Sequence, residues 1–306
     1  MVRAFLFPRF WPWRLAVAVG FPWLFGFLVD RMVRLPGGQI QRAIEWRILM
    51  AIVDVLVLLA VLRWMEGRSL EQSGLFSLAG LGRRLAEGLA LGAGPIAVHA
   101  AALAAVGMYV FTLPGGASVA EAVVLAVVIL LVGFEEEVRY RALAFRTLDQ
   151  GVGSVLAMAI SGAFFGISHA TNRGATPLSI AVIAVGGVFL AALYLRYGNL
   201  WAPIAFHFAW DATMGVVLGL PVSGTQIPAF VHAEIRGPEA WTGGQFGPEA
   251  SIALQPFVFA AAAFYLWRVV VQGKLTVPPW RARPEPMPTD SPIAAAGPSN
   301  PPTQRP

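Results

Sequence analysis

The sequence predicts an all-α, polytopic membrane protein, a helical bundle of about eight transmembrane helices. Of its 306 residues, 57% are hydrophobic and only 13% are charged, whereas a soluble domain carries about 25% charged residues. The apolar residues gather in long runs, several of them near the ~20 residues that a helix needs to cross a bilayer. Strands are not expected, because the runs are long, rich in Ala and Leu, and lack the alternation of a membrane barrel.

Eight apolar stretches are the expected helices. The first is short and is interrupted by Pro22, but three tryptophans near its ends suit the aromatic belt of a membrane interface. In the third, Gly88 and Gly92 form a pair of small residues that favours close helix packing. The stretches cover residues 15–29, 44–65, 85–111, 119–148, 152–170, 178–195, 199–220 and 252–271.

Basic residues set the expected orientation. With eight spans, both termini lie on one side of the membrane, and that side holds sixteen of the 22 Lys and Arg residues. Cytoplasmic loops carry an excess of Lys and Arg, so we expect a protein of the inner (plasma) membrane with both termini in the cytoplasm. Arg47 belongs to a group of four arginines, at residues 31–47, that falls on the other side and breaks this rule. The polar segment 221–250 would be an external loop.

The expected domain organisation is one transmembrane domain, 1–273, followed by a tail, 274–306. Ten prolines between residues 278 and 306 indicate that the tail is disordered. The absence of cysteine excludes disulfides, thiolate nucleophiles and cysteine-ligated metals. The basic residues form no stripe, so nucleic acid is not expected as a partner.

Three adjacent glutamates follow the apolar run of the fourth stretch. On a helix, Glu137 would pair with Arg141 and Glu135 with Arg139, because residues four apart are neighbours. The residue four after Glu136 is a tyrosine, so Glu136 is free to face another group. The alternative interpretation is a charged helix end at the membrane surface.

Two further polar clusters follow. His169 ends the fifth stretch, with Phe165 one turn behind on the same face. Ser168 is not expected to pair with His169 as a nucleophile, because adjacent residues of a helix point about 100° apart. In the seventh stretch, His207 and Asp211 share one face, and they could ligate a metal or place a carboxylate behind an imidazole.

The expected depths of these residues along their helices overlap, so the three clusters would lie at a similar level in the membrane. At a rise of about 1.5 Å per residue, Glu136 and Asp211 lie about 18 Å from the cytoplasmic end of their helices. His169 lies about 25 Å deep and His207 about 12 Å deep. Ionisable groups inside a membrane are costly and mark functional sites by default. The sequence therefore predicts one site inside the bilayer that opens toward the cytoplasm.

The three clusters resemble the motifs of the CPBP intramembrane protease family, which includes the type II CAAX prenyl endopeptidases and bacterial relatives linked to bacteriocin immunity. The resemblance covers residues 119–215 and implies a glutamate-dependent endopeptidase. Its substrate would be a membrane protein or a lipidated peptide. The motifs are Glu136-Glu137-x-x-x-Arg141, Phe165-x-x-x-His169 and His207-x-x-x-Asp211.

By position, the resemblance implies a role for each residue. Glu136 would be the general base, His169 would help to hold the attacking water, and His207 and Asp211 would stabilise the oxyanion. Many members carry Asn in place of Asp211; an ionised Asp only accepts hydrogen bonds, so Asp211 must be protonated or must act by orienting His207. The residues that shape the site would be Glu137, Arg141 and Phe165.

Three alternatives stay open. One is a zinc hydrolase with Glu136, His169 and His207 as ligands, although no HExxH motif is present. We favour chemistry without a metal or other cofactor. The second is a non-catalytic immunity or scaffold protein of the same fold. The third is a transporter, which would more often show internal repeats than this chain does.

Overall fold

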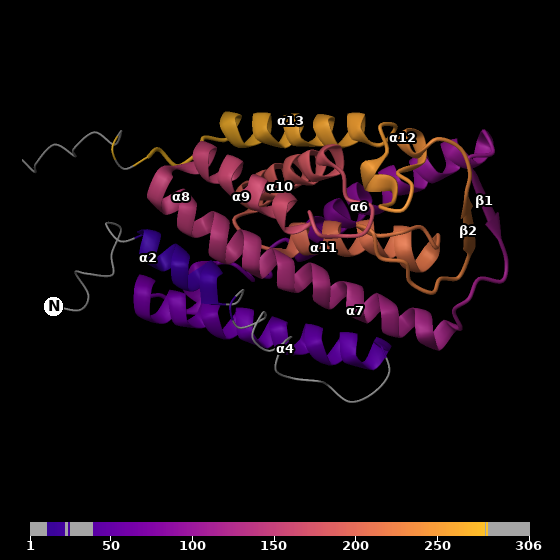
Figure 1. Cartoon of the computed structure of the whole chain (residues 1–306). Helices are drawn as coiled ribbons and strands as arrows, with labels where there is room; N and C mark the ends of the chain where they lie inside the picture. The colour runs from indigo at the N-terminus through magenta and orange to yellow at the C-terminus, as the bar shows by residue number, and fades with distance from the viewer. Residues whose placement is uncertain (1–10, 22–23, 25–38, 279, 281–306) are drawn as a thin grey trace, which may run out of the picture.

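The computed structural model describes residues 11–21, 24, 39–278 and 280, and they form a bundle of helices (Figure 1). Two short strands, β1 (Tyr109–Thr112) and β2 (His232–Ile235), pair antiparallel with Tyr109 opposite Ile235. The helices in chain order are α2 (Trp11–Leu15) with η2 (Ala16–Gly20), α4 (Gln39–Ala60) with η3 (Val61–Glu66), α5 (Leu70–Ser73), α6 (Leu81–Ala105), α7 (Val119–Glu137) with η4 (Val138–Phe145) and α8 (Arg146–Val152), α9 (Ser154–Ser168), α10 (Pro177–Tyr197), α11 (Trp201–Asp211) with η5 (Ala212–Val217), α12 (Glu239–Thr242), η6 (Pro248–Ala250) and α13 (Gln255–Val271).

The predicted helices correspond closely to the observed ones. Each stretch from the second to the eighth coincides with a helix of the bundle. Of the first stretch, 15–29, only residues 15–21 and 24 belong to the described chain, and most of the predicted tail, 274–306, lies outside it. The mostly helical fold class is therefore confirmed for the described residues.

The expectation of no strands is wrong. The third stretch ends as a helix at Ala105 instead of residue 111, and Gly107, with φ of 74°, turns the chain into β1. A left-handed residue of this kind ends a helix because most side chains disfavour it. Val110 and Phe111 continue the apolar run into the strand, so composition does not mark the boundary.

Three helical segments of the described chain are long and apolar enough to cross a membrane. They are Glu45–Glu66, Leu81–Ala105 and Pro177–Tyr197, and two shorter apolar helices are Ser154–Ser168 and Gln255–Val271. A span needs about 20 apolar residues, which explains why the shorter helices do not qualify by length.

The bundle has two distinct ends. α2 and the end of α13 lie at one end, and β1 and β2 lie at the other (Figure 1). The segment 221–250, expected as a polar loop, holds β2, α12 and η6 at the strand end. The site described below lies between these two ends of the bundle.

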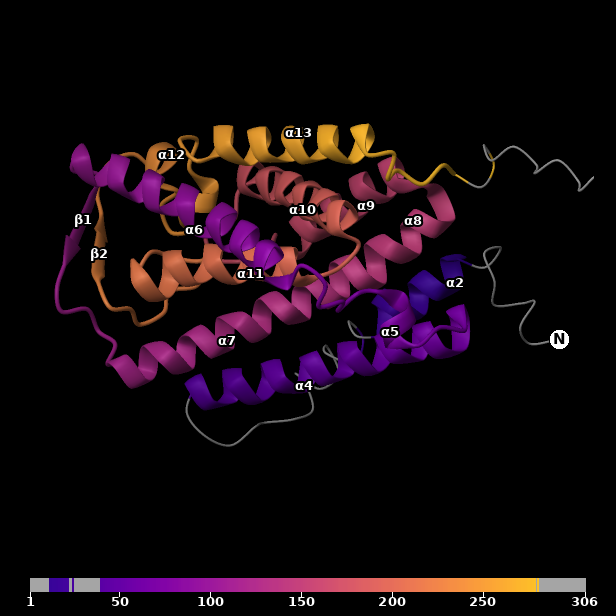
Figure 2. The same cartoon turned by 180° about the vertical axis from the view of Figure 1, so that it is seen from behind.

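α11 packs closely against α6, which crosses it in the view of Figure 2. A Cβ added to Gly88 would lie 2.4 Å from the carbonyl oxygen of Ala202, and one added to Gly92 would lie 2.4 Å from that of Phe206. On the α7 side, a Cβ on Gly133 would lie 3.3 Å from Cβ of His207. The predicted small-residue packing of α6 is thus present, and it holds α11 against α7.

Candidate active site

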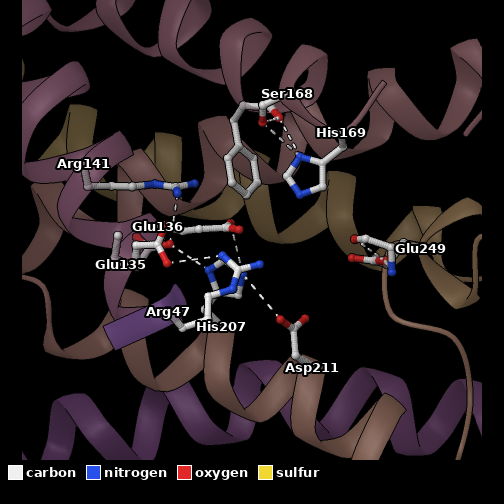
Figure 3. A network of polar contacts seen from close by, with 12 residues as sticks. Arg47, Glu135, Glu136, Arg141, Ser168, His169, His207, Asp211 and Glu249 are labelled. Carbon is white, nitrogen blue, oxygen red and sulfur yellow. Dashed lines mark hydrogen bonds and ion pairs between the residues drawn. The ribbon is translucent and has the colours of Figure 1, made fainter. Parts of the chain in front are cut away.

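The three polar clusters meet in one pocket of about 710 Å³. Glu136 comes from the last turn of α7, His169 caps the C-terminus of α9, and His207 and Asp211 lie one turn apart on α11. Nε2 of His207 lies 3.6 Å from Oε2 of Glu136 and 3.6 Å from Oδ2 of Asp211. Figure 3 shows these side chains directed toward one another.

The flanking glutamates are both held by arginines. Glu135 forms ion pairs with Arg139 at 2.7 Å and with Arg47 of α4 at 3.2 Å. Glu137 forms an ion pair with Arg141 at 3.0 Å. Glu136 pairs with neither arginine of its own helix, as the spacing predicted, and its Oε2 is buried with no hydrogen bond from the described residues.

Glu137 also orients His207. Its Oε1 lies 3.0 Å from Nδ1 of His207, and a carboxylate held by Arg141 accepts a hydrogen bond, so Nδ1 carries the proton. Nε2 is then the nitrogen that faces Glu136 and Asp211. Glu137 is therefore the carboxylate at Nδ1 of His207, and Asp211 lies on the side of the opposite nitrogen.

His169 is fixed by the last turn of α9. Its Nδ1 lies 2.8 Å from the carbonyl oxygen of Phe165 and 3.2 Å from Oγ of Ser168. Ser168 and His169 approach each other because His169 leaves the helical geometry at φ −94° and ψ 0°. Ser168 Oγ donates to the Phe165 carbonyl at 2.7 Å, so its proton is not directed at the imidazole. Nδ1 also faces that carbonyl, which leaves Nε2 on the pocket side (Figure 3).

Phe165 packs against the Arg141 guanidinium and against both imidazoles. The Arg141 guanidinium lies 4.5 Å from the centre of its ring, and the rings of His169 and His207 lie edge-on at 4.9 Å and 6.3 Å. Arg141 is only 2% exposed, and the aromatic face compensates part of the cost of burying its charge. The predicted site-shaping residues therefore form one packed layer behind the pocket.

Two residues of the pocket were not named as site residues from the sequence. Arg47 lies within α4 and forms an ion pair with Glu135. Its place inside an apolar run could have indicated this. Glu249 of η6 also lines the pocket and accepts hydrogen bonds from the backbone N–H and the hydroxyl of Ser223, at 2.6 Å and 2.7 Å. No local spacing pointed to Glu249, because a loop brings it to the site.

A large part of the remaining pocket wall is apolar. It extends from α7 to α10 and α13, away from the charged cluster. Such a wall suits an apolar segment of a ligand, while the few polar groups fix its orientation. Representative wall residues are Leu125, Ile129, Val182, Phe189 and Phe257.

The arrangement of the acidic and histidine side chains bears on the zinc alternative. Within them, no group of three or more His, Cys, Asp or Glu side chains has a geometry that could hold a metal ion. The zinc ligand set considered from the sequence, Glu136, His169 and His207, is thus not assembled as a metal centre in this conformation.

Comparison with known proteins gives a match to one family model. No curated protein and no solved structure matches the chain. Residues 118–213, however, match the family model described as type II CAAX prenyl endopeptidase Rce1-like. The match agrees with the expected core of 119–215 and includes every site residue named from the sequence. Together with the apolar helices, it marks a membrane protein. Residues 118–213 of this chain are therefore similar to the Rce1-like type II CAAX prenyl endopeptidases, which supports the resemblance expected from the sequence motifs.

Proposed function

We propose that the protein is an intramembrane endopeptidase that hydrolyses a peptide bond of a membrane-associated substrate with water activated by Glu136. The family match supports a peptidase. One observation carries the assignment of the base: Oε2 of Glu136 is buried, makes no hydrogen bond with the described residues, and faces Nε2 of His207 across 3.6 Å. Buried polar atoms almost always have a partner, and a water molecule would supply one here.

In the proposed reaction, Glu136 takes a proton from this water and the oxygen attacks the substrate carbonyl. A positioned base of this kind contributes about 10²–10⁴-fold to the rate. Nε2 of His169, on the pocket side, accepts a hydrogen bond that holds the water. Glu136 then passes the proton to the leaving amine, so the carboxylate is regenerated.

The oxyanion would be bound on the other side of the attacking water. In this proposal His207 is protonated on both ring nitrogens, so that Nδ1–H donates to the Glu137 carboxylate and Nε2–H can donate to the oxyanion. Asp211, 3.6 Å from Nε2, would donate as the protonated acid. Donors already in place for the developing negative charge are commonly the largest contribution to catalysis of this type.

The lining of the pocket supports a membrane-associated substrate. The apolar wall beside Glu136 suits the lipid chain of a lipidated peptide or the apolar segment of a membrane protein. The proposed setting is the plasma membrane, with about eight spans and both termini in the cytoplasm. No nucleic acid and no cofactor take part.

The test uses Glu136→Gln, which keeps the shape of the side chain and removes the base. Purified protein in proteoliposomes would be assayed on a farnesylated CAAX reporter peptide, and membrane proteomes of cells with either form would be compared. We expect loss of cleavage by about 10² or more. Glu121→Gln is the matched control, because Glu121 lies on the same helix and forms the capping box with Ser118 at the helix start.

Full activity of Glu136→Gln would contradict the proposed base. Wild-type protein that cleaves neither the reporter nor any membrane protein would favour the scaffold alternative. A chelator arm separates the zinc version: we expect wild-type activity to persist after incubation with a tight chelator. Activity that is lost and then restored by zinc would instead assign the metal-dependent reaction.

A further inference from the structure

A second pocket, of about 350 Å³, lies where the first turn of α6 meets the ends of α10 and α13. None of its lining residues lines the pocket around Glu136. Four of its six lining residues carry a positive charge, and no carboxylate lines it within the described chain. The lining residues are Arg83, Arg196, Tyr197, Arg268, Gln272 and Lys274.

The carboxylate beneath this pocket is already occupied. Glu87 accepts hydrogen bonds from the hydroxyls of Tyr265, at 2.5 Å, and of Tyr197. It also lies 3.5 Å from Nε of Arg196. Among the pocket cations, Glu87 interacts with Arg83 and Arg196. In the part of the chain that the structure describes, Arg268 and Lys274 form no ion pair.

The basic side chains are held in place by aromatic and backbone contacts. The Arg196 guanidinium lies 5.2 Å from the centre of the Tyr197 ring, and Arg84 approaches the same ring at 5.7 Å. Lys274 donates to the backbone carbonyl of Arg196 at the end of α10. Burial, followed by the charges of Arg196 and Arg84, lowers the pKa of Lys274, which is the expected response of an amine in an uncompensated positive field.

The surroundings place the pocket at the level of lipid head groups. α6 and α10 are both long and apolar enough to span a membrane, and the pocket lies at their ends. Trp267 lies near the C-terminal end of α13 and Trp280 follows that helix in the chain; they are 56% and 64% exposed. Exposed tryptophans gather at the interface between the hydrocarbon and water.

We propose that this pocket binds a phosphate group with net negative charge, supplied by the head group of an anionic phospholipid. Basic pockets between membrane helices have the chemistry to bind such head groups. A zwitterionic head group fits less well, because its ammonium group would meet the same four cations. The site is separate from the proposed catalytic chemistry and does not depend on it.

The test is native mass spectrometry of the full-length protein titrated with phosphatidylglycerol or phosphatidylcholine. Arg83→Gln/Arg268→Gln removes two pocket cations. Arg63→Gln/Arg68→Gln removes the same charge from two exposed arginines outside the pocket. We expect the wild type and the control to retain one phosphatidylglycerol, and the pocket variant to bind it at least about tenfold more weakly. Phosphatidylcholine should not discriminate between the proteins.

Equal loss of phosphatidylglycerol in both double variants would overturn the proposal, since general charge would then explain the binding. If the pocket variant does not fold, Lys274→Gln, at an exposed position, serves in its place, with binding weakened about threefold to fivefold. A second arm uses inorganic phosphate and thermal unfolding. If phosphate stabilises only proteins with an intact pocket and the lipid titrations agree among all variants, the source is soluble phosphate and the lipid is refuted.

Discussion

The three consecutive glutamates show how neighbouring identical residues acquire different environments. Glu135 and Glu137 each meet an arginine four residues later on the same helical face, and Glu136 points instead toward His207. The buried charge of Glu137 is shared between Arg141 and the imidazole of His207, which fixes the ring. The environment of each carboxylate therefore depends on its position within a single turn.

Asp211 offers a test at the residue scale. If it donates a hydrogen bond to the oxyanion, Asp211→Asn keeps a donor of the same shape, and we expect activity close to that of the wild type. Asp211→Val removes the donor and should lower kcat by about 10²–10³-fold. Both variants are assayed on the reporter peptide in proteoliposomes. Loss of activity in Asp211→Asn equal to that in Asp211→Val would show that the ionised carboxylate is needed.

At the scale of elements, π-helical segments follow both charged motifs. η4 begins directly after Glu137, and η5 begins directly after Asp211. A π-helical turn widens the helix by one residue, and such turns are frequent at functional sites. In this protein η4 connects α7 to α8 without a break in the helix, while the local register changes.

The contact between α6 and α11 gives the prediction for this scale. Gly88→Ala places a Cβ 2.4 Å from the backbone oxygen of Ala202, so the helices must separate and α11 must move with His207. We expect a lower unfolding temperature and reduced cleavage. Gly94→Ala is the matched control on the same helix, because its Cβ would have no atom within 4 Å and alanine favours a helix over glycine by about 0.5–1 kcal/mol. Equal thermal stability of the two variants would show that the close approach is not required.

At the scale of the whole molecule, the candidate site is assembled from segments far apart in the chain. Arg47 comes from α4, His169 from α9, His207 from α11 and Glu249 from η6. The site lies between an end with α2 and the end of α13, and an end with β1 and β2 (Figure 1). We expect the end with α2 and the end of α13 to face the cytoplasm.

The absence of cysteine from the sequence makes that topology measurable with single introduced thiols. Arg68→Cys lies between η3 and α5, and Ala240→Cys lies in α12 near the strand end; both positions are exposed. We expect a membrane-impermeant maleimide to label Ala240→Cys in intact cells and Arg68→Cys only after permeabilisation. The excess of basic residues on the cytoplasmic side is the physical reason. The reverse labelling pattern would invert the orientation.

The sequence by itself determined the apolar helices, the small-residue packing face of α6 and the pairing of Glu135 and Glu137 with arginines four residues later. These features depend on helical periodicity and composition, which act over a few residues. Only the tertiary structure decided that Glu137 orients His207, that Arg47 and Glu249 border the site, and that an apolar run ends in a strand. These contacts join residues many positions apart, such as the 88 positions between Arg47 and Glu135, and they depend on how whole helices pack. No local pattern encodes that packing, because the same apolar faces could pack against lipid or against several neighbouring helices.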